Sequence, residues 1–354
     1  MPAHSDEIDL LEGLLSQYSP SEREHPAVEY LVDAMTRRGF RASIDDAGNA
    51  VGVIGQGLKE VLLLGHIDTV EGWIDIRTEG DLLYGRGAVD AKGPLSTFVC
   101  AAVRAAVLTG GLRITVVGAV EEEAATSKGA RHVLTQRRPD CVVIGEPSQW
   151  DRITLGYKGR LLLDYHLRRD SSHTAGREAS VCEEMVAFWL RLKQHADTYN
   201  QGKERLFDLL DPSLRHVASK GDGLSEHAEA TVGLRLPVGL DVEALKRAIV
   251  EMAGPAAVSF YAEEVAFRAG KNNELARALT AAIRQAGGEP AFKVKTGTSD
   301  MNVVGPVWNC PIVAYGPGDS NLDHTPNEHL GLEEYGRAID VLTDALVTLG
   351  GGGS

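Results

Sequence analysis

The stretch Val61–Gly93 decides how this chain folds; it begins VLLLGHIDTV and ends GRGAVDAKG. Its first four residues are continuously apolar, which is typical of a strand buried on both faces of a parallel sheet. Gly65 ends that run, and His66 and Asp68 follow at the carboxyl end of the strand, the edge where open α/β sheets place their binding sites. Asp90 follows on a second loop, between glycines that allow the backbone to approach a ligand closely.

Buried strands and helical patterns alternate around this stretch. Apolar stripes at helical spacing predict helices near residues 6–18 and from Val28 to Met35, and an Ala-rich helix covers 94–108. Continuous apolar runs at 112–120 and 141–144 predict two further buried strands. The alternation predicts an α/β domain with helices on both faces of its sheet.

The pattern changes after Trp150 and returns near Asn273. The segment between them predicts a small inserted domain of strands and helices in the order β-α-β-α-β. Its polar residues 198–228 are predicted to be irregular. The predicted elements are one or two strands in 153–167, a helix at 183–192, a strand at 228–236, a helix at 242–252 and a strand at 258–267. After the return, a final amphipathic helix is predicted over 332–348.

Charge and composition exclude several classes of function. The 354 residues carry 50 acidic side chains against 36 Lys and Arg, a net charge of −14, whereas nucleic-acid binding needs a basic footprint. No apolar run approaches the ~20 residues of a membrane span, and the first residues, MPAHSDEIDL, do not resemble a signal peptide. The four cysteines lie far apart (Cys100, Cys141, Cys182 and Cys310) and predict a reducing, cytoplasmic location without disulfides.

Carboxylates and imidazoles stand where several predicted strands end. Glu121-Glu122-Glu123 closes the strand at 112–120, Glu146 closes the next one within IGEPS, and His324 lies on a late loop. Each of these is a weak signal by itself, and His66-x-Asp68 alone is better explained as a solvated loop pair. Three adjacent carboxylates at the end of a buried strand, however, repel one another unless cations or protons compensate them. Together, at one sheet edge, the groups predict two zinc ions that share one carboxylate, Asp90.

Five motifs in this order, GHIDTV, GRGAVDAKG, AVEEE, IGEPS and LDHTPNEH, resemble those of the M20 family of zinc aminoacylases and carboxypeptidases. The resemblance spans nearly the whole chain. It implies a zinc-peptidase-like α/β catalytic domain with a central mixed sheet, formed by residues 1–155 and 268–348. A smaller α+β domain at 156–267 would interrupt it, acting as a lid and a dimerisation domain. The Gly-rich tail, 349–354, is predicted to be flexible.

The resemblance also implies roles for single residues. Asp68 would orient His66, the peptide bond after Asp90 would be cis, and Glu122 would be the general base. Because Glu121 stands where the family has Asp, the register within Glu121-Glu122-Glu123 stays open, although the spacing from the strand favours Glu122 as the base. The implied ligands of the two divalent ions, zinc or alternatively cobalt, are His66, Asp90 and Glu146 for one and Asp90, Glu123 and His324 for the other.

Two residues of the inserted domain and one loop resemble substrate-side positions of the family. His173, in SSHTAG, would stabilise the oxyanion, and Arg235, in GLRLP, would lie near the substrate carboxylate. A surface-loop histidine and an arginine on an exposed strand remain the alternatives for these two. Asp300, in GTSD, is a candidate partner for a cationic side chain of the substrate.

GRGAVDAKGPL, EEEAATSKGAR and KTGTSDMNVVG most resemble the M20 branch that releases lysine or ornithine from a small acidic amino-group carrier protein of the LysW type. Arg160, Arg168, Arg169 and Arg177 are candidates for a local basic patch that meets this carrier. The alternative is a deacylase of small N-acyl amino acids, of acetylornithine deacetylase or succinyl-diaminopimelate desuccinylase type. A catalytically inactive ligand-binding relative is a third reading. A dinucleotide loop at Gly85-x-Gly87 is disfavoured, because Asp90 stands where the third glycine belongs.

Overall fold

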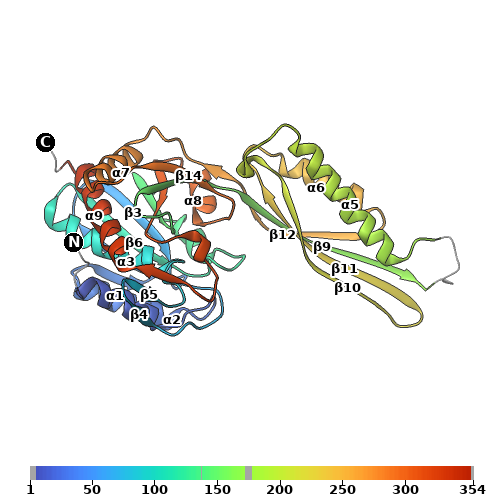
Figure 1. Cartoon of the computed structure of the whole chain (residues 1–354), viewed down its shortest axis with the longest axis horizontal. Coiled ribbons are helices and arrows are strands. Elements are labelled where there is room, and N and C mark those ends of the chain that lie inside the picture. Colours follow the sequence, from blue (N-terminus) through green and yellow to red (C-terminus); the bar gives the residue numbers. More distant parts are fainter. Residues whose placement is uncertain (1–4, 137, 172–177, 352–354) are drawn as a thin grey trace. The chain divides into compact units, whose positions relative to one another are not determined.

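The computed structural model describes residues 5–136, 138–171 and 178–351. The chain divides into two compact units (Figure 1). The first contains the residues up to Gly156, Arg268–Val294 and the residues from Ser299 onward. The second contains Tyr157–Phe267 and Lys295–Thr298.

A nine-stranded mixed sheet, counted over the described residues, forms the centre of the first unit. Its order is β1-β2-β6-β3-β7-β15-β8-β13, with β14 paired to β8. Strands β6, β3, β7 and β15 are parallel, which confirms the α/β fold with a central mixed sheet. The strands are β1 Arg41–Ile44, β2 Ala50–Gly55, β3 Lys59–His66, β6 Leu112–Ala119, β7 Cys141–Gly145, β8 Arg152–Tyr157, β13 Phe267–Arg268, β14 Ala291–Lys295 and β15 Ile312–Tyr315. Strands β4 Arg77–Glu79, β5 Leu82–Tyr84 and β16 His329–Gly331 form a small separate sheet.

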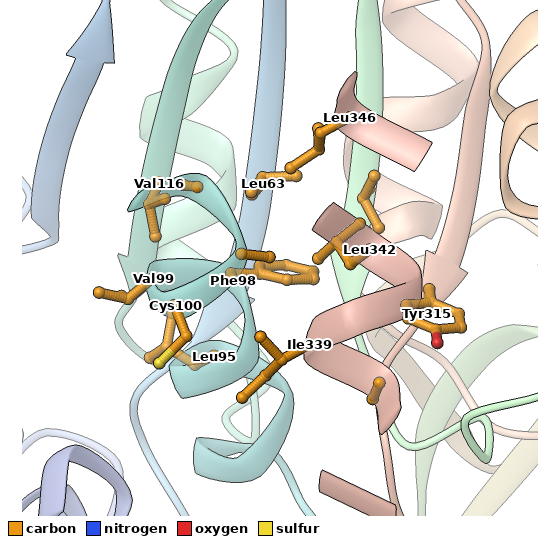
Figure 2. Packing of buried hydrophobic residues seen from close by; sticks show 14 of the residues in the cluster. Leu63, Leu95, Phe98, Val99, Cys100, Val116, Tyr315, Ile339, Leu342 and Leu346 are labelled. Carbon is orange, nitrogen blue, oxygen red and sulfur yellow. The ribbon is translucent and has the colours of Figure 1, made fainter. Parts of the chain in front are cut away.

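One face of the large sheet packs on a layer of long helices because apolar side chains of β3 and β6 point toward it. Figure 2 shows Phe98 of α3 among Leu63, Ile339 and Leu342, all fully buried. Full burial of such a side chain contributes about 1.5–3 kcal/mol. The helices of this layer are α1 Ser5–Leu15, α2 His25–Arg37, α3 Lys92–Leu108, α7 Glu274–Gln285 and α9 Leu332–Leu349. Residue Gly39, in left-handed conformation (φ +90°), follows the end of α2.

Two short helices, α4 Lys128–Val133 and α8 Asp300–Trp308, lie over the opposite face. There, Leu62 and Val117 share a pocket with Val133 and Trp308. Helices therefore cover both faces, as the sequence pattern predicts. Helix α8 and strand β14 are not anticipated by that pattern.

The second unit is an antiparallel four-stranded sheet, in the order β10-β11-β9-β12, with two helices packed on one face. Leu161, Leu163 and Tyr165 alternate inward along β9 and form a core of their own with α5 and α6. The elements are β9 Gly159–Asp170, α5 Val181–Asn200, the 3₁₀ helix Leu206–Asp208, β10 Asp211–Gly221, β11 Ser225–Leu236, α6 Val242–Ala253 and β12 Ala257–Glu264.

The prediction that residues 198–228 are irregular is wrong. Strand β10 lies within them, α5 extends to Asn200, and β11 already begins at Ser225, so the order is β-α-β-β-α-β. The sequence of β10, DPSLRHVASKG, has no apolar alternation because the strand lies at the edge of its sheet and is largely exposed.

Two absences can be checked in the part of the chain that the structure describes. All four cysteines are described and none forms a disulfide. No described helix combines the length and the apolarity that a membrane crossing requires.

Candidate metal centre

Three parallel strands bring the predicted ligands to one edge of the large sheet. Gly65 of β3 is in register with Gly118 of β6 and with Gly145 of β7, so the residues that follow leave the sheet side by side. His66 ends β3. The glutamates after β6 and Glu146 after β7 therefore emerge next to the imidazole, as the pattern of strand ends predicts.

Asp90 lies between two imidazoles and presents one oxygen to each. His66 Nε2 is 3.1 Å from Asp90 Oδ1, and His324 Nε2 is 3.1 Å from Asp90 Oδ2. Glu123 Oε1 is 2.8 Å from the same His324 nitrogen. Ligand atoms of Asp90, Glu123 and His324 all lie within 4.8 Å of one another. The peptide bond between Asp90 and Ala91 is cis, as the resemblance implied.

The groups at this edge fit two divalent cations. Imidazole nitrogens and carboxylate oxygens are ligands that Zn²⁺ and similar ions accept, and the two oxygens of Asp90 face different imidazoles, as a bridging carboxylate requires. Glu146 is buried directly after β7, near enough to Glu122 for its charge to raise the pKa of that residue. Buried carboxylates of like charge are thus gathered where cations would compensate them.

The pKa values reflect this crowding. Burial raises the pKa of Glu122 well above its usual value, and the charges of Glu146, Asp300 and Glu123 raise it further against the opposing effect of His66. Burial, followed by the charge of Asp90, also raises the pKa of Glu123. Without cations, burial and mutual repulsion therefore favour the protonated form of each of these carboxylates.

Asp68 contacts the imidazole of His66, which it is predicted to orient, and it also contacts the segment after β6. His66 Nδ1 lies 3.0 Å from the backbone carbonyl of Asp68 and 3.4 Å from its carboxylate. The carboxylate itself accepts the backbone N–H groups of Glu122 (3.1 Å) and Glu123 (3.0 Å) and the hydroxyl of Ser21 (2.7 Å). Asp68 therefore fixes the segment that carries the two glutamates as well as the ring of His66.

Glu121 is engaged away from the imidazoles. Its carboxylate accepts the hydroxyl of Thr126 at 2.6 Å and lies 3.3 Å from Lys128 Nζ. Among the three consecutive glutamates it is Glu123 that contacts His324. This geometry favours the register with Glu122 as base and Glu123 as ligand.

The predicted substrate-side residues are distributed over both units. His173 lies outside the described residues. Arg235 belongs to the second unit, where its Nη1 lies 3.4 Å from Thr298 Oγ1. Asp300 belongs to the first unit, is buried at the start of α8, and is close enough to raise the pKa of Glu122.

Three further charged residues are buried beside the site, and none of them was predicted to have a role there: Arg86, Lys92 and Glu328. Burial lowers the pKa of Lys92 to about 7, although the charges of Glu328 and Asp68 oppose this effect. Its Nζ donates to the carbonyls of Leu14 (3.2 Å) and Gln17 (2.6 Å). Arg86, Lys92 and Glu328 could have been suspected from the sequence only because they lie inside GRGAVDAKG and LDHTPNEH, the motifs that also contain Asp90 and His324.

His324 gives a prediction about pH. Hydrogen bonds to Asp90 and Glu123 raise its pKa from 6.5 to about 10. A raised folded-state pKa contributes stability that is present below pH 6.5 and is lost as pH rises through 10. In metal-free protein we therefore expect wild type to melt above His324→Gln at pH 6.5, and the difference in Tm to shrink toward pH 10. The pKa of Lys92 is lowered rather than raised, but Lys92 is present in both proteins, so its contribution cancels in the Tm difference. A Tm difference that stays constant or grows with pH would contradict the assignment.

The comparisons with known proteins identify the family. The sequence model of peptidase family M20/M25/M40 matches residues 62–348. A LysW-lysine hydrolase of Deinococcus radiodurans is 49% identical over 352 residues, which cover 97% of each chain. A putative LysW-lysine/LysW-ornithine hydrolase of Thermococcus kodakarensis is 36% identical, over 99% of this chain and 94% of that one.

Solved structures share the fold. An M20 family metallo-carboxypeptidase from Sulfolobus solfataricus superimposes with a TM-score of 0.80 at 18% identity, covering 96% of this chain and 98% of that one. A Bacillus subtilis protein described as a dinuclear metal-binding peptidase of the M20 family does so with a TM-score of 0.70 at 12% identity, covering 98% of each. The family match over most of the sequence and the 49% identical relative show that this chain belongs to peptidase family M20/M25/M40.

Proposed function

We propose that this chain is a di-metal amide hydrolase that releases L-lysine, L-ornithine or both from the C-terminal Glu side chain of a small acidic amino-group carrier protein. The observation that carries the hydrolase assignment is the placement of Asp90 between His66 and His324, with Glu122 beside them. The carrier substrate is supported by the 49% identical relative, which is named for that reaction. Such an enzyme serves amino-acid biosynthesis and is expected in the cytoplasm, without nucleic-acid or membrane partners.

The proposed ligands divide between two ions, zinc or alternatively cobalt. Two such cations, held by these residues, would supply Lewis-acid polarisation of the scissile carbonyl and would lower the pKa of a bound water toward about 7. The proposed ligand sets are His66, Asp90 and Glu146 for one ion and Asp90, Glu123 and His324 for the other.

Glu122 performs the proton transfers. Cations bound beside it would favour its ionised form, opposing the burial that raises its pKa in their absence. It accepts the proton of the attacking water and passes it to the nitrogen of the departing amine, so that one side chain serves as base and then as acid. Asp68 keeps Glu122 in place through the backbone N–H at 3.1 Å. His173 is assigned to the oxyanion of the tetrahedral intermediate.

Substrate roles are proposed for two residues on the basis of the resemblance. Asp300 would pair with the cationic side chain of lysine or ornithine, and Arg235 with its carboxylate. In the second unit, Arg160 is the register partner of Arg235, so both lie on the same face of the sheet, the face away from α5 and α6. Arg168 follows on that face, exposed, and these cations suit an acidic carrier. Arg169 is tied to the carbonyl of Ala179 and to Glu184.

The test is a comparison of substrates with the zinc-loaded enzyme. The carrier conjugated to lysine and the carrier conjugated to ornithine should be hydrolysed. Free N-acetylornithine and N-succinyl-diaminopimelate, at equal concentration, should be turned over far more slowly. Faster hydrolysis of either small molecule than of both conjugates would replace the carrier proposal by the small-molecule deacylase, and the metal chemistry would stand unchanged.

We further propose that the second unit serves as a lid and joins two copies into a homodimer. Its edge strand β10 is largely exposed, and Leu214 and Val217 on it are accessible together with Val186 and Leu190 of α5. An exposed edge strand beside an apolar helix face is an aggregation hazard unless a partner covers it.

A pair of matched variants tests the dimer. Val186 and Val250 are each 52% exposed, on α5 and α6 respectively. We expect Val186→Asp to shift the protein to monomer in light scattering after size exclusion, because a buried unpaired charge opposes association. Val250→Asp should leave the dimer intact. A monomeric wild type, or equal behaviour of the two variants, would contradict this interface.

A further inference from the structure

A buried ion pair stands behind the bridging aspartate. Glu328 is fully buried and its Oε2 accepts a hydrogen bond from Arg86 Nη1 at 2.8 Å; Arg86 is buried as well. The pairing of β16 with β5, which places His329 opposite Tyr84, brings the residue before β16 next to the loop that leads to Asp90. Arg86 and Glu328 lie in different motifs of the sequence, 242 positions apart.

The pair holds the loop that carries Asp90. Glu328 Oε1 accepts the backbone N–H of Val89 at 2.9 Å and that of Asp90 at 3.0 Å. These bonds act on the main chain of Asp90 and leave its carboxylate free to face the two imidazoles. They therefore fix the position of the Asp90 backbone, from which the bridging carboxylate extends.

The same pair holds the loop that carries His324. Arg86 Nη1 also donates to the carbonyl of Thr325 at 3.3 Å, and its Nε donates to the carbonyl of Gly72 at 3.0 Å. His324 itself has left-handed backbone conformation, φ +61°, which a non-glycine residue adopts only where its surroundings enforce it. The contacts of Arg86 with Thr325 and Glu328 hold the chain that follows His324 and contribute to this enforcement.

We infer that Arg86 and Glu328 are positioning residues that set the separation between Asp90 and His324, and thereby the affinity of the centre for the ion that these two side chains share. This inference rests on the metal centre of the proposed function. It adds two residues that touch neither ion nor substrate and act through the backbone of the ligands.

Two features of the Arg86–Glu328 pair distinguish positioning of the ligands from direct metal binding and from charge compensation. Both oxygens of Glu328 are engaged by protein donors, so this carboxylate is not a further ligand. The two charges also cancel, so the pair adds no net charge to the crowded anionic centre. A buried ion pair is weak evidence for stability, because apolar replacements often stabilise a fold as well or better; positioning accounts for its location behind two ligands.

The test measures Zn²⁺ affinity by competition with a chromophoric chelator in the full-length protein. Glu328→Gln keeps one oxygen for the two N–H groups but turns an amide donor toward Arg86. We expect it to weaken binding of one Zn²⁺ by about 10–100-fold, the range typical of partners that orient ligands, with kcat lowered at subsaturating zinc and KM for substrate unchanged. Arg86→Lys retains the cation, loses the fork that reaches three acceptors, and should weaken the same ion in the same sense.

Glu7→Gln is the matched control. Among the two carboxylates that pair with Arg104, Glu7 and Asp340, it neutralises the first, which forms a partly buried ion pair at 2.6 Å between α1 and α3 of the same unit. It should lower Tm without changing zinc affinity. Wild-type zinc affinity in Glu328→Gln would overturn the inference, as would equal weakening in Glu7→Gln; if Glu328→Gln does not fold, the same criteria apply to Arg86→Lys. A wild type that binds no zinc would instead refute the metal centre itself.

Discussion

Asp90→Asn is expected to abolish stable binding of the metal pair and, with it, hydrolysis. The substitution keeps the size of the side chain but removes the charge that two cations share, and it presents an N–H₂ group to one of the two imidazoles 3.1 Å away. Because both ions lose a ligand at once, the loss of affinity should exceed the ~10–100-fold typical of a residue that merely orients a ligand. Metal content by elemental analysis after dialysis, with turnover of the carrier conjugate, measures the effect.

Asp319→Asn is a suitable control for that variant. Asp319 is partly exposed and precedes the 3₁₀ helix Ser320–Leu322, where it accepts the backbone N–H of Asn321. Its loss should leave metal content and turnover close to wild type. Two bound ions per chain in Asp90→Asn would show that Asp90 is not the shared ligand.

Glu122→Gln is expected to retain both metal ions and to lose turnover by ~10²–10⁴-fold, the usual contribution of a general acid–base. The amide cannot take a proton from water at neutral pH, whereas the backbone N–H that Asp68 accepts is unchanged. The measurement is kcat of the zinc-loaded variant, with metal content determined on the same sample.

Glu121→Gln supplies the matched control, because it makes the same chemical change one residue earlier in the chain. Its carboxylate contacts Thr126 and Lys128 rather than the imidazoles. Turnover in this variant should stay near that of wild type. The opposite result, with Glu121→Gln inactive and Glu122→Gln active, would move the base to Glu121.

The strands that position the site could be predicted because burial leaves a continuous signal. Strand β7 and residues 61–64 of β3 are unbroken apolar runs, and the polar residues after them mark the sheet edge. The carboxylates and imidazoles at strand ends then follow from the rule that parallel strands share a carboxyl edge. The contacts of Asp90 with both His66 and His324 agree with that expectation.

Elements without such a signal could not be predicted. Strand β10 lies at a sheet edge and is largely exposed, so its sequence lacks the period-two alternation of a half-buried strand. Helix α8 begins at the buried Asp300 and contains Pro306, features that normally indicate a loop. The roles of Arg86 and Glu328 depend on hydrogen bonds to backbone groups, which no pattern of side chains along the chain reveals.

Anomalous diffraction from a crystal of the zinc-loaded protein is the most direct measurement of the metal centre. Two peaks are expected, roughly 3.5–4 Å apart, with one oxygen of Asp90 bound to each, His66 and Glu146 on the first ion and Glu123 and His324 on the second. A single peak, or two peaks of which only one contacts Asp90, would contradict the shared-carboxylate centre from which the proposed hydrolysis follows.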